Sequence, residues 1–212
     1  MIVVAIDGPA GAGKSTIARA LAQRLGVQYL DTGAMYRAVT CEALREEVPL
    51  DDPEQVGRIA RSCDLHVGLD TVSINGRDVT AEIRSPEVTS AVSRVAALSI
   101  VRAEMRRRQR AWGESRGGGV IEGRDIGTVV FPDATLKVFL TASPRVRAER
   151  RVQQSGGDVD QVEASIAERD RIDSSRPDSP LAESSDSVVV DTSTSTVEEV
   201  VDAIIQLLEE RR

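Results

Sequence analysis

Residues 1–16 read MIVVAIDGPAGAGKST, and this stretch decides the fold. It opens with an apolar run from Ile2 to Ile6, the pattern of a strand buried on both faces of a parallel sheet. The segment from Gly8 to Ser15 then has the spacing Gly, four residues, Gly-Lys-Ser. Glycines let the backbone N–H groups of such a loop turn toward a phosphate, and the following helix adds the positive end of its dipole. The sequence therefore begins with a predicted strand, phosphate-binding loop and helix.

The loop carries the residue types that hold a nucleoside triphosphate. Lys14 is expected to reach the β- and γ-phosphates, and the hydroxyl of Ser15 is expected to bind Mg²⁺. The expected ATP-binding residues of the loop are Gly8, Pro9, Ala10, Gly11, Ala12, Gly13, Lys14, Ser15 and Thr16. GTPases, transport ATPases and small-molecule kinases share this loop. The chain has no Asn-Lys-x-Asp tetrapeptide with which a GTPase reads guanine, and this favours a kinase.

The composition narrows the class of protein further. Apolar residues make up 41% of the chain, which is normal for a globular protein, but aromatic residues make up only 2%, too few for the stacking platforms of a single-strand nucleic-acid binder. A net charge of −7 argues against duplex DNA and membrane surfaces as partners. Cys41 and Cys63 lack metal-site spacing. The opening residues have no basic leader and no apolar run reaches membrane-spanning length, so we expect a cytoplasmic monomer that binds small molecules.

Predicted strands and helices alternate along most of the chain, which indicates an α/β fold with a five-stranded parallel sheet flanked by helices. The expected strands are residues 2–6, 27–30, 119–122, 136–140 and 187–190. The first helix shows apolar residues at Ile17, Leu21 and Leu25, with Gly26 placed to end it. Further helices are expected at 35–46, at 100–112, and after Ser85-Pro86, Ser143-Pro144 and the capping box of Thr196 and Glu199.

Two segments depart from this alternation. Within residues 61–95, apolar and polar residues alternate around Asn75-Gly76, a strong signal for a two-residue hairpin turn. Because a hairpin does not belong inside a doubly wound sheet, we interpret residues 61–95 as an insertion. Residues 144–182 are polar and rich in Arg and Asp, and we interpret them as a helical lid. The core then consists of residues 1–60, 96–143 and 183–212.

Three further segments resemble the bacterial cytidylate kinases, which are P-loop nucleoside monophosphate kinases. The segments are Leu30–Arg37 (LDTGAMYR), Glu122–Thr128 (EGRDIGT) and Glu168–Asp170 (ERD), and the likeness runs nearly end to end, through Val130–Ala134 (VFPDA). Adenylate kinases lack the first two of these elements. The resemblance implies transfer of the γ-phosphoryl group of ATP to CMP and dCMP, assisted by Mg²⁺, with the hairpin insertion as part of a monophosphate-binding region.

The resemblance also implies roles for particular residues. Those that would contact the cytosine ring are Thr32, Arg102 and Asp125. Those that would hold the monophosphate are Tyr36, Arg37 and Arg124, the last of which could also reach the base edge. Those that would contact ribose and the phosphates are Arg169, Asp173 and Arg176, and those that would approach ATP from the lid are Arg150 and Arg151. The implied catalytic set is Lys14, Arg124, Asp125, Arg169 and Arg176.

Some charged residues receive a plainer interpretation. The run Arg106–Arg110 is expected to form a solvated helix face with ion pairs, and Arg145 and Arg147 are expected to be solvated. Glu122 departs from the family pattern, because many members have Asp at this position. Two alternative functions remain open from the sequence: a kinase of another small anionic acceptor, such as UMP or shikimate, and a nucleotide-binding regulatory module with little turnover.

Overall fold

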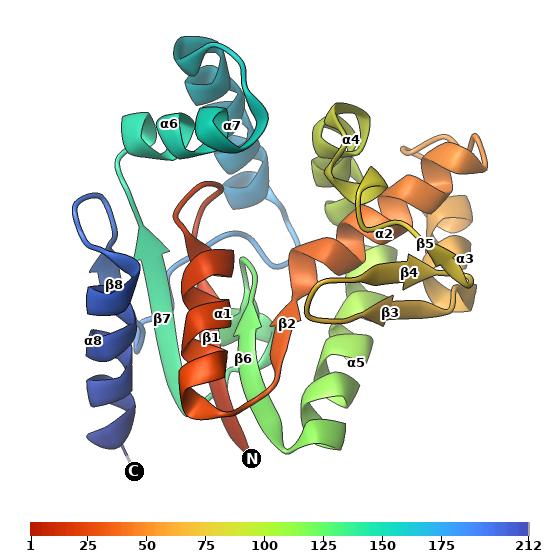
Figure 1. Ribbon diagram of the computed structural model, residues 1–212. Helices are drawn as coiled ribbons and strands as arrows, with labels where there is room; N and C mark the ends of the chain where they lie inside the picture. The colour runs from red at the N-terminus through yellow and green to blue at the C-terminus, as the bar shows by residue number, and fades with distance from the viewer. Residues whose placement is uncertain (212) are drawn as a thin grey trace. The chain divides into compact units, whose positions relative to one another are not determined.

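The computed structural model describes residues 1–211 and contains a five-stranded parallel sheet and a separate three-stranded antiparallel sheet (Figure 1). The order of the large sheet is β2-β6-β1-β7-β8. Its strands are β1 (Ile2–Asp7), β2 (Tyr29–Asp31), β6 (Gly118–Glu122), β7 (Leu136–Thr141) and β8 (Val188–Asp191). In the register, Val4 of β1 lies between Val120 of β6 and Leu136 of β7. The predicted parallel sheet is confirmed.

The predicted helices form close to the expected residues, and the structure adds a helix at Pro53–Ser62 that the sequence did not predict. They are α1 (Lys14–Leu25), α2 (Thr32–Arg45), α3 (Pro53–Ser62), α4 (Pro86–Ala96), α5 (Ser99–Arg116), α6 (Pro144–Ser155), α7 (Val159–Ser175) and α8 (Val197–Glu209). Gly26 ends α1 in the left-handed conformation, and Thr196 and Glu199 form the predicted capping box of α8. Two shorter turns complete the chain, a 3₁₀ turn η1 (Glu82–Arg84) and a π turn η2 (Ile126–Val130).

The chain divides into two compact units. The first consists of Met1–Tyr29 and Gly113–Arg212, and the second of Leu30–Trp112. The first unit therefore contains the Gly-rich loop and helices α6 and α7 of the predicted lid. The second contains α2, the predicted insertion and most of α5.

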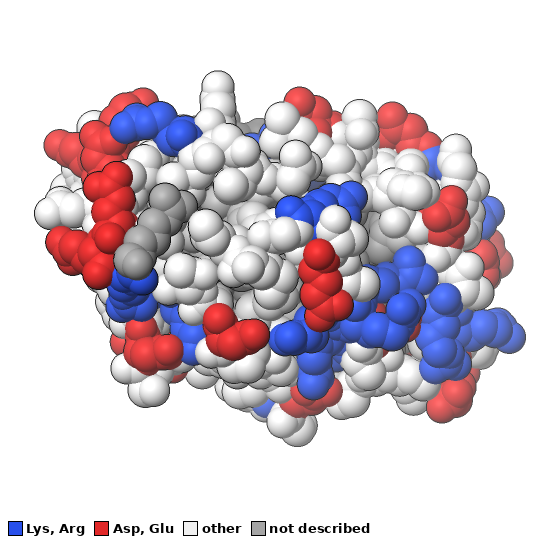
Figure 2. Space-filling model, turned by 90° about the horizontal axis from the view of Figure 1, so that it is seen from below, with Lys and Arg blue, Asp and Glu red and all other residues white. Residues whose placement is uncertain are grey.

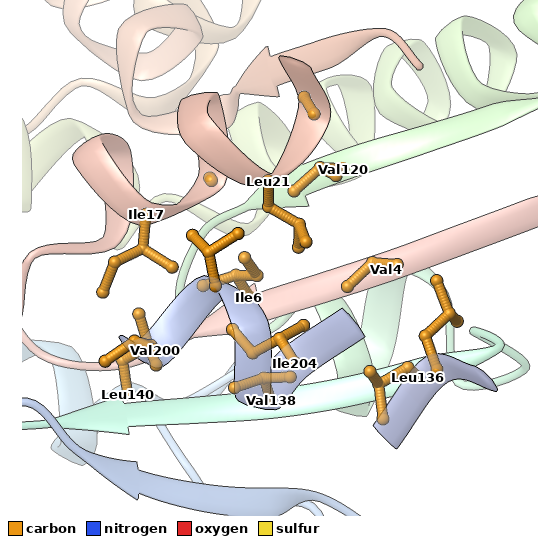
Figure 3. Packing of buried hydrophobic residues seen from close by; sticks show 14 of the residues in the cluster. Val4, Ile6, Ile17, Leu21, Val120, Leu136, Val138, Leu140, Val200 and Ile204 are labelled. Carbon is orange, nitrogen blue, oxygen red and sulfur yellow. The ribbon is translucent and has the colours of Figure 1, made fainter. Parts of the chain in front are cut away.

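The core of the first unit lies between the large sheet and helices α1 and α8 (Figure 3). Leu21 of α1 and Ile204 of α8 are fully buried against Ile6 and Val138 of the sheet. Burial of each such side chain contributes about 1.5–3 kcal/mol to folding. Strand β1 is buried along Val3–Ile6, as its apolar run predicts. The loop after β1 therefore begins at a strand end that the core holds in place.

The second unit contains the small sheet, formed by β3 (Leu65–Val67), β4 (Val72–Ile74) and β5 (Arg77–Asp78). Asn75 and Gly76 both have positive φ angles, of 52° and 75°, as a type I′ hairpin turn requires. The predicted hairpin is confirmed. Glu42 of α2 accepts hydrogen bonds from Asn75 (2.8 Å) and Arg77 (3.2 Å), so this buried carboxylate ties the hairpin to α2.

The arginine run of α5 is only partly the solvated face that we expected. Arg107 is exposed and pairs with Glu104, as predicted. Arg108 also pairs with Glu104, but its guanidinium donates to three carbonyls at the end of α3, those of Ala60, Arg61 and Cys63. The prediction is therefore wrong for Arg108, which caps another helix. Figure 2 shows Lys and Arg side chains grouped over part of the face that it presents. Within residues 1–211, no helix is long and apolar enough to cross a membrane.

Candidate functional site

The Gly-rich loop lies between the end of β1 and the start of α1, where the sequence predicts it. Gly8 has a φ of +146°, and a Cβ there would lie only 2.1 Å from the carbonyl oxygen of Leu140. Gly11 has a φ of +79° and packs against the backbone of Arg147, which leaves no room for a side chain. Gly13 is left-handed too and precedes the first turn of α1. The loop can therefore be built only with glycine at these positions, and it directs a helix N-terminus at any bound anion.

Lys14 is buried at the base of the loop, and its Nζ donates to the carbonyl of Pro9 at 2.8 Å. Burial above all, together with the positive charges of Arg124 and Arg169, lowers the pKa of Lys14 to about 7, against the opposing effect of Glu122 and Asp7. Burial and the neighbouring guanidiniums thus disfavour the charged ammonium of Lys14, and a phosphate group bound beside it would favour that charge.

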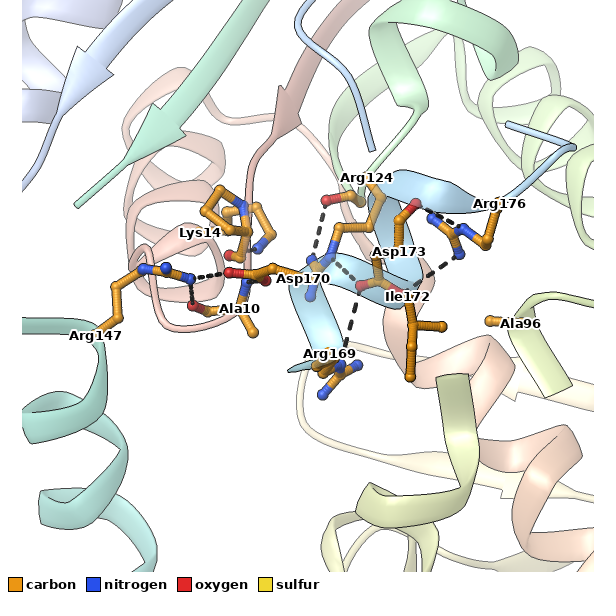
Figure 4. A network of polar contacts seen from close by, with 12 residues as sticks. Ala10, Lys14, Ala96, Arg124, Arg147, Arg169, Asp170, Ile172, Asp173 and Arg176 are labelled. Carbon is orange, nitrogen blue, oxygen red and sulfur yellow. Dashed lines mark hydrogen bonds and ion pairs between the residues drawn. The ribbon is translucent and has the colours of Figure 1, made fainter. Parts of the chain in front are cut away.

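Three arginines converge on one buried carboxylate in the same unit (Figure 4). The Oδ2 atom of Asp173 lies 3.1 Å from Nε of Arg124 and 4.0 Å from Nε of Arg169. Its Oδ1 atom lies 3.8 Å from Nη1 of Arg176, and Arg176 also donates to the Asp173 carbonyl at 3.1 Å. Guanidiniums gathered in this way suit phosphoryl groups, which they can bind through charge-assisted hydrogen bonds.

Burial lowers the pKa of Arg169 to about 10, with further contributions from the positive charges of Arg124 and Arg151. Arg169 and Arg124 come from α7 and from the residues after β6, which are far apart in the sequence. The structure thus brings four of the five predicted catalytic residues together in one cluster: Lys14, Arg124, Arg169 and Arg176. The fifth, Asp125, is buried beside Arg124 in the chain, before η2.

Helices α6 and α7 contact the Gly-rich loop through a buried ion pair (Figure 4). Arg147 of α6 donates to the carbonyl of Ala10 at 3.0 Å and to the carboxylate of Asp170 of α7. That carboxylate also accepts from the N–H of Ala10 at 3.3 Å. The expectation of a solvated side chain is confirmed for Arg145, which is 53% exposed, but it is wrong for Arg147, because α6 packs directly on the loop.

Arg150 and Arg151, the two arginines of the predicted lid that we expected to approach ATP, differ in their hydrogen bonding. Arg150 donates to the hydroxyl of Thr192 at 2.9 Å, and that hydroxyl in turn bonds the carbonyl of Ala12 at 3.1 Å. Arg150 is therefore linked to the Gly-rich loop through Thr192. The guanidinium of Arg151 has no hydrogen-bond or ion-pair partner among residues 1–211, but its charge affects Arg169.

The residues after β6 are fixed by the end of β1. Gly123 donates its N–H to the carbonyl of Ile6 at 2.9 Å. Ile126 and Gly127 donate theirs to the two carboxylate oxygens of Asp7, at 2.9 and 2.7 Å. Burial raises the pKa of Asp7 to about 6, although these two N–H groups oppose the shift. Glu122, at the end of β6, is also buried, and its Oε1 accepts a hydrogen bond from the hydroxyl of Tyr29.

The second unit holds the remaining predicted acceptor residues. Thr32 is buried at the start of α2, which Asp31 caps by accepting from the N–H of Ala34 at 2.9 Å. The guanidinium of Arg102 lies 5.5 Å from the centre of the Tyr36 ring and donates to the carbonyl of Ala96 at 3.1 Å. The structure thus brings Arg102 and Tyr36 together within this unit.

Arg37 lies in the next position of α2 and is held by two other segments. Its Nη1 donates to the carbonyl of Ile83 and to the hydroxyl of Thr89, both at 2.9 Å. These contacts place Arg37 against η1 and α4, so the insertion positions this arginine. Thr89 was not among the predicted site residues.

Sequence reasoning missed Asp7, Tyr29 and Arg147 as parts of the site. Asp7 carried a usable signal, because it is an ionisable residue at the end of an otherwise apolar, fully buried strand. Tyr29 and Arg147 carried none, because their partners lie at distant positions in the chain.

The residues that could hold a metal ion are few. Among residues 1–211, no three His, Cys, Asp or Glu side chains gather into a metal site. Ser15 is exposed at the first turn of α1, beside the loop. One protein hydroxyl with phosphate and water oxygens fits Mg²⁺, which keeps several waters and seldom binds in an all-protein cage.

Comparisons with known proteins agree with this geometry. The family model described as cytidylate kinase matches residues 4–210. The chain is 46% identical, over 100% of its length and 94% of the relative's, to a cytidylate kinase of Streptomyces avermitilis. It is 51% identical to a bifunctional pantoate ligase/cytidylate kinase of Prochlorococcus marinus, of which it spans 43%, against 97% of its own length. A crystal structure of a gluconokinase from Sinorhizobium meliloti matches with a TM-score of 0.53 and 16% identity, over 99% of this chain and 92% of that one, which shows a shared fold.

Proposed function

The chain belongs to the cytidylate kinase family, the ATP-dependent kinases of CMP, and from this premise we propose how its residues serve the transfer. The acceptors are CMP and dCMP, and the products are ADP with CDP or dCDP. The observation that carries the proposal is the cluster of Lys14, Arg124, Arg169 and Arg176, in which the three guanidiniums converge on the single carboxylate of Asp173. Neither alternative function is favoured by the relatives, which are cytidylate kinases over the full length of this chain.

The phosphates are the groups that this cluster recognises. ATP lies in the Gly-rich loop, with Lys14 on its β- and γ-phosphates and Arg150 and Arg151 contributing from α6. Arg124, Arg169 and Arg176 stabilise the charge that spreads over the γ-phosphoryl group as it moves between the two nucleotides. Because phosphoryl transfer needs little covalent chemistry from the protein, positioning and charge stabilisation account for the rate.

The residues that hold CMP in this proposal are those for which the family resemblance implies that role. Thr32, Arg102 and Asp125 hydrogen-bond the cytosine ring, and Tyr36 and Arg37 hold the monophosphate. A site that pairs donors and acceptors with one base rejects a base that leaves those groups unpaired. The burial of Thr32, Arg102 and Asp125 supports this role, because buried polar groups are the ones that discriminate between bases.

Mg²⁺ is held by the Ser15 hydroxyl together with the nucleotide phosphates. It would neutralise the phosphate oxygens and orient the γ-phosphoryl group when bound. Helices α6 and α7 act as the lid, and the contacts of Arg147 and Asp170 with Ala10 of the Gly-rich loop support this role. The protein acts as a monomer, which size-exclusion chromatography with light scattering would check.

The test is a panel of acceptors with ATP and Mg²⁺. We expect coupled ADP release to be fastest with CMP and dCMP, slower with UMP, and slowest with AMP, GMP and shikimate. Faster turnover with AMP would contradict the base assignment. Tight ATP binding without acceptor-stimulated ADP release would instead support the regulatory alternative. Lys14→Ala should lower transfer by orders of magnitude in a folded protein, because the role of Lys14 is electrostatic.

The base assignment has its own test. Asp125→Ala should raise the KM for CMP much more than it changes the ATP hydrolysis seen without acceptor. An equal loss in both rates would mean that Asp125 serves the phosphates or the fold and not the base.

A further inference from the structure

We propose that Asp7 is a positioning residue for the acceptor side of the reaction, because it fixes the loop that carries Arg124 and Asp125. The inference rests on the proposed roles of those two residues. Asp7 is outside the phosphate-loop pattern and is not one of the residues for which the family resemblance implies a role.

The dipeptide Arg124-Asp125 lies between two anchors that both come from the end of β1. Ahead of it, the Gly123 N–H donates to the carbonyl of Ile6 at 2.9 Å. Behind it, the Ile126 N–H donates to Oδ1 of Asp7 at 2.9 Å and the Gly127 N–H to Oδ2 at 2.7 Å. Only two residues separate the anchors. Neither Arg124 nor Asp125 can therefore move far unless a buried hydrogen bond breaks.

The fixing continues through the backbone of Asp125 itself. Its carbonyl accepts the N–H groups of Val129 at 2.9 Å and Val130 at 3.1 Å, which close the π turn η2. A π turn is an uncommon element that is often found at functional sites. Asp7 holds the first two N–H groups of this turn, so its carboxylate sets where the turn begins and how Asp125 enters it.

A carboxylate is the side chain that fits these two donors. Each of its oxygens accepts one N–H group, whereas the amide of Asn has one oxygen that accepts and one NH₂ group that donates. An Asn at residue 7 would satisfy Ile126 or Gly127 and present a donor to the other. The same strand end continues into Gly8, so the donor loop and the acceptor dipeptide are attached to one point of the sheet.

The buried carboxylate of Asp7 lowers the stability of the fold. Asp7 is 6% exposed, and burial raises its pKa to about 6. A carboxyl group whose pKa is raised on folding destabilises the fold as it ionises, so the loss of stability grows from about pH 4 and is complete above about pH 6. Residues that a fold retains against stability are often those that its activity needs. We therefore expect Asp7→Asn to keep or raise the melting temperature while it impairs the use of CMP.

The experiment compares Asp7→Asn with Asp52→Asn. Asp52 is a matched control, because its carboxylate accepts the N–H groups of Glu54 and Gln55 at 3.1 and 3.0 Å and caps α3, which carries no candidate site residue. We expect the KM for CMP of Asp7→Asn to rise by about tenfold or more, while the KM for ATP stays within about twofold. Asp52→Asn should leave both values unchanged.

Two further variants make the result decisive. Asp7→Glu keeps the charge and both oxygens but moves them by one methylene, so it should also raise the KM for CMP. Asp125→Ala is measured in parallel. If Asp125→Ala raises that KM and both Asp7 variants leave it unchanged, the inference is overturned and the proposed function stands. If Asp125→Ala leaves it unchanged too, the base assignment fails and the inference fails with it. Unfolding of both Asp7 variants would also overturn the inference, because Asp7 would then serve the fold.

Discussion

Nucleotide binding should be accompanied by proton uptake at Lys14. In the nucleotide-free protein, burial and the neighbouring charges of Arg124 and Arg169 lower the pKa of Lys14 to about 7. Phosphate oxygens favour the charged ammonium and would return its pKa toward about 10. A pKa that rises on binding means that protons are taken up, and affinity should then fall as the pH rises above 7.

The size of the effect follows from the pKa. At pH 8, about nine-tenths of the Lys14 side chains are neutral before binding, so each bound nucleotide should take up about 0.9 proton. At pH 7 the uptake should be about half a proton from the same relation. Near pH 8 the affinity should therefore weaken by nearly tenfold per pH unit, about 1.2 kcal/mol of binding free energy.

Isothermal titration calorimetry measures this uptake directly. ADP with Mg²⁺ is titrated near pH 8 in Tris and in HEPES, which differ in ionisation enthalpy, and the difference in observed heat gives the protons exchanged. At this pH the nucleotide phosphates and Asp7 are already ionised and do not contribute. Lys14→Met should abolish the uptake. Lys137→Met is the control, because Lys137, the other lysine of the chain, pairs with Asp186 at 2.8 Å outside the loop. Binding heats that are the same in both buffers would refute the reasoning.

Three further predictions concern the buried carboxylates and their partners. The hydrogen bond from Arg45, with those of Asn75 and Arg77, lowers the pKa of Glu42 to about 2, so its stabilisation of about 3 kcal/mol is present above pH 4.5 and is lost as the pH falls toward 2. Urea unfolding should show that gap between wild type and Glu42→Gln at pH 6 and a smaller gap at pH 3; an equal gap would contradict the reasoning. Arg147→Leu, which removes only the arginine of the ion pair with Asp170, should lower the free energy of unfolding by about 3 kcal/mol. Adding Asp170→Leu to this variant should recover part of that loss, whereas additive losses would mean that the two residues do not interact. Replacing the phenol that holds Glu122, by Tyr29→Phe, should cost about 1.5–3 kcal/mol in thermal unfolding, and an unchanged melting temperature would show that the carboxylate finds another donor.

Local sequence signals predicted much of the fold because the interactions that they depend on are local. Asn75 and Gly76 are residue types that tolerate the positive φ angles of a type I′ turn, and the side chains of Thr196 and Glu199 cap α8 within one turn. The apolar run of β1 predicted its burial because only a central parallel strand is covered on both faces. The strand expected at residues 27–30 begins instead at Tyr29, since Val27 still bonds back to α1 through the carbonyl of Ala22.

The parts of the site that the sequence did not predict depend on distant partners. Arg147 lies in a polar segment whose composition predicts a solvated side chain. It is buried instead, because its guanidinium donates to the carbonyl of Ala10 in the Gly-rich loop and to the Asp170 carboxylate. Asp7 was interpreted only as the end of a strand, because its partners are backbone N–H groups about 120 residues away, which carry no signal in the side-chain sequence. The family resemblance indicated Arg124, Arg169, Asp173 and Arg176 as candidates, but the convergence of the three arginines on the Asp173 carboxylate was seen only in the structure.

The carboxylate of Asp173 has a consequence for which anions can bind. In the free protein it acts as an internal counter-ion for Arg124, Arg169 and Arg176. A phosphodiester carries one negative charge, which is no more than the Asp173 carboxylate already supplies, so it gains little by binding to these arginines. A phosphomonoester brings two charges and can share the guanidiniums with the carboxylate. With the proposed phosphate-binding role of these arginines, the Asp173 carboxylate should disfavour internal phosphodiesters and cyclic nucleotides relative to phosphomonoesters, independently of the base.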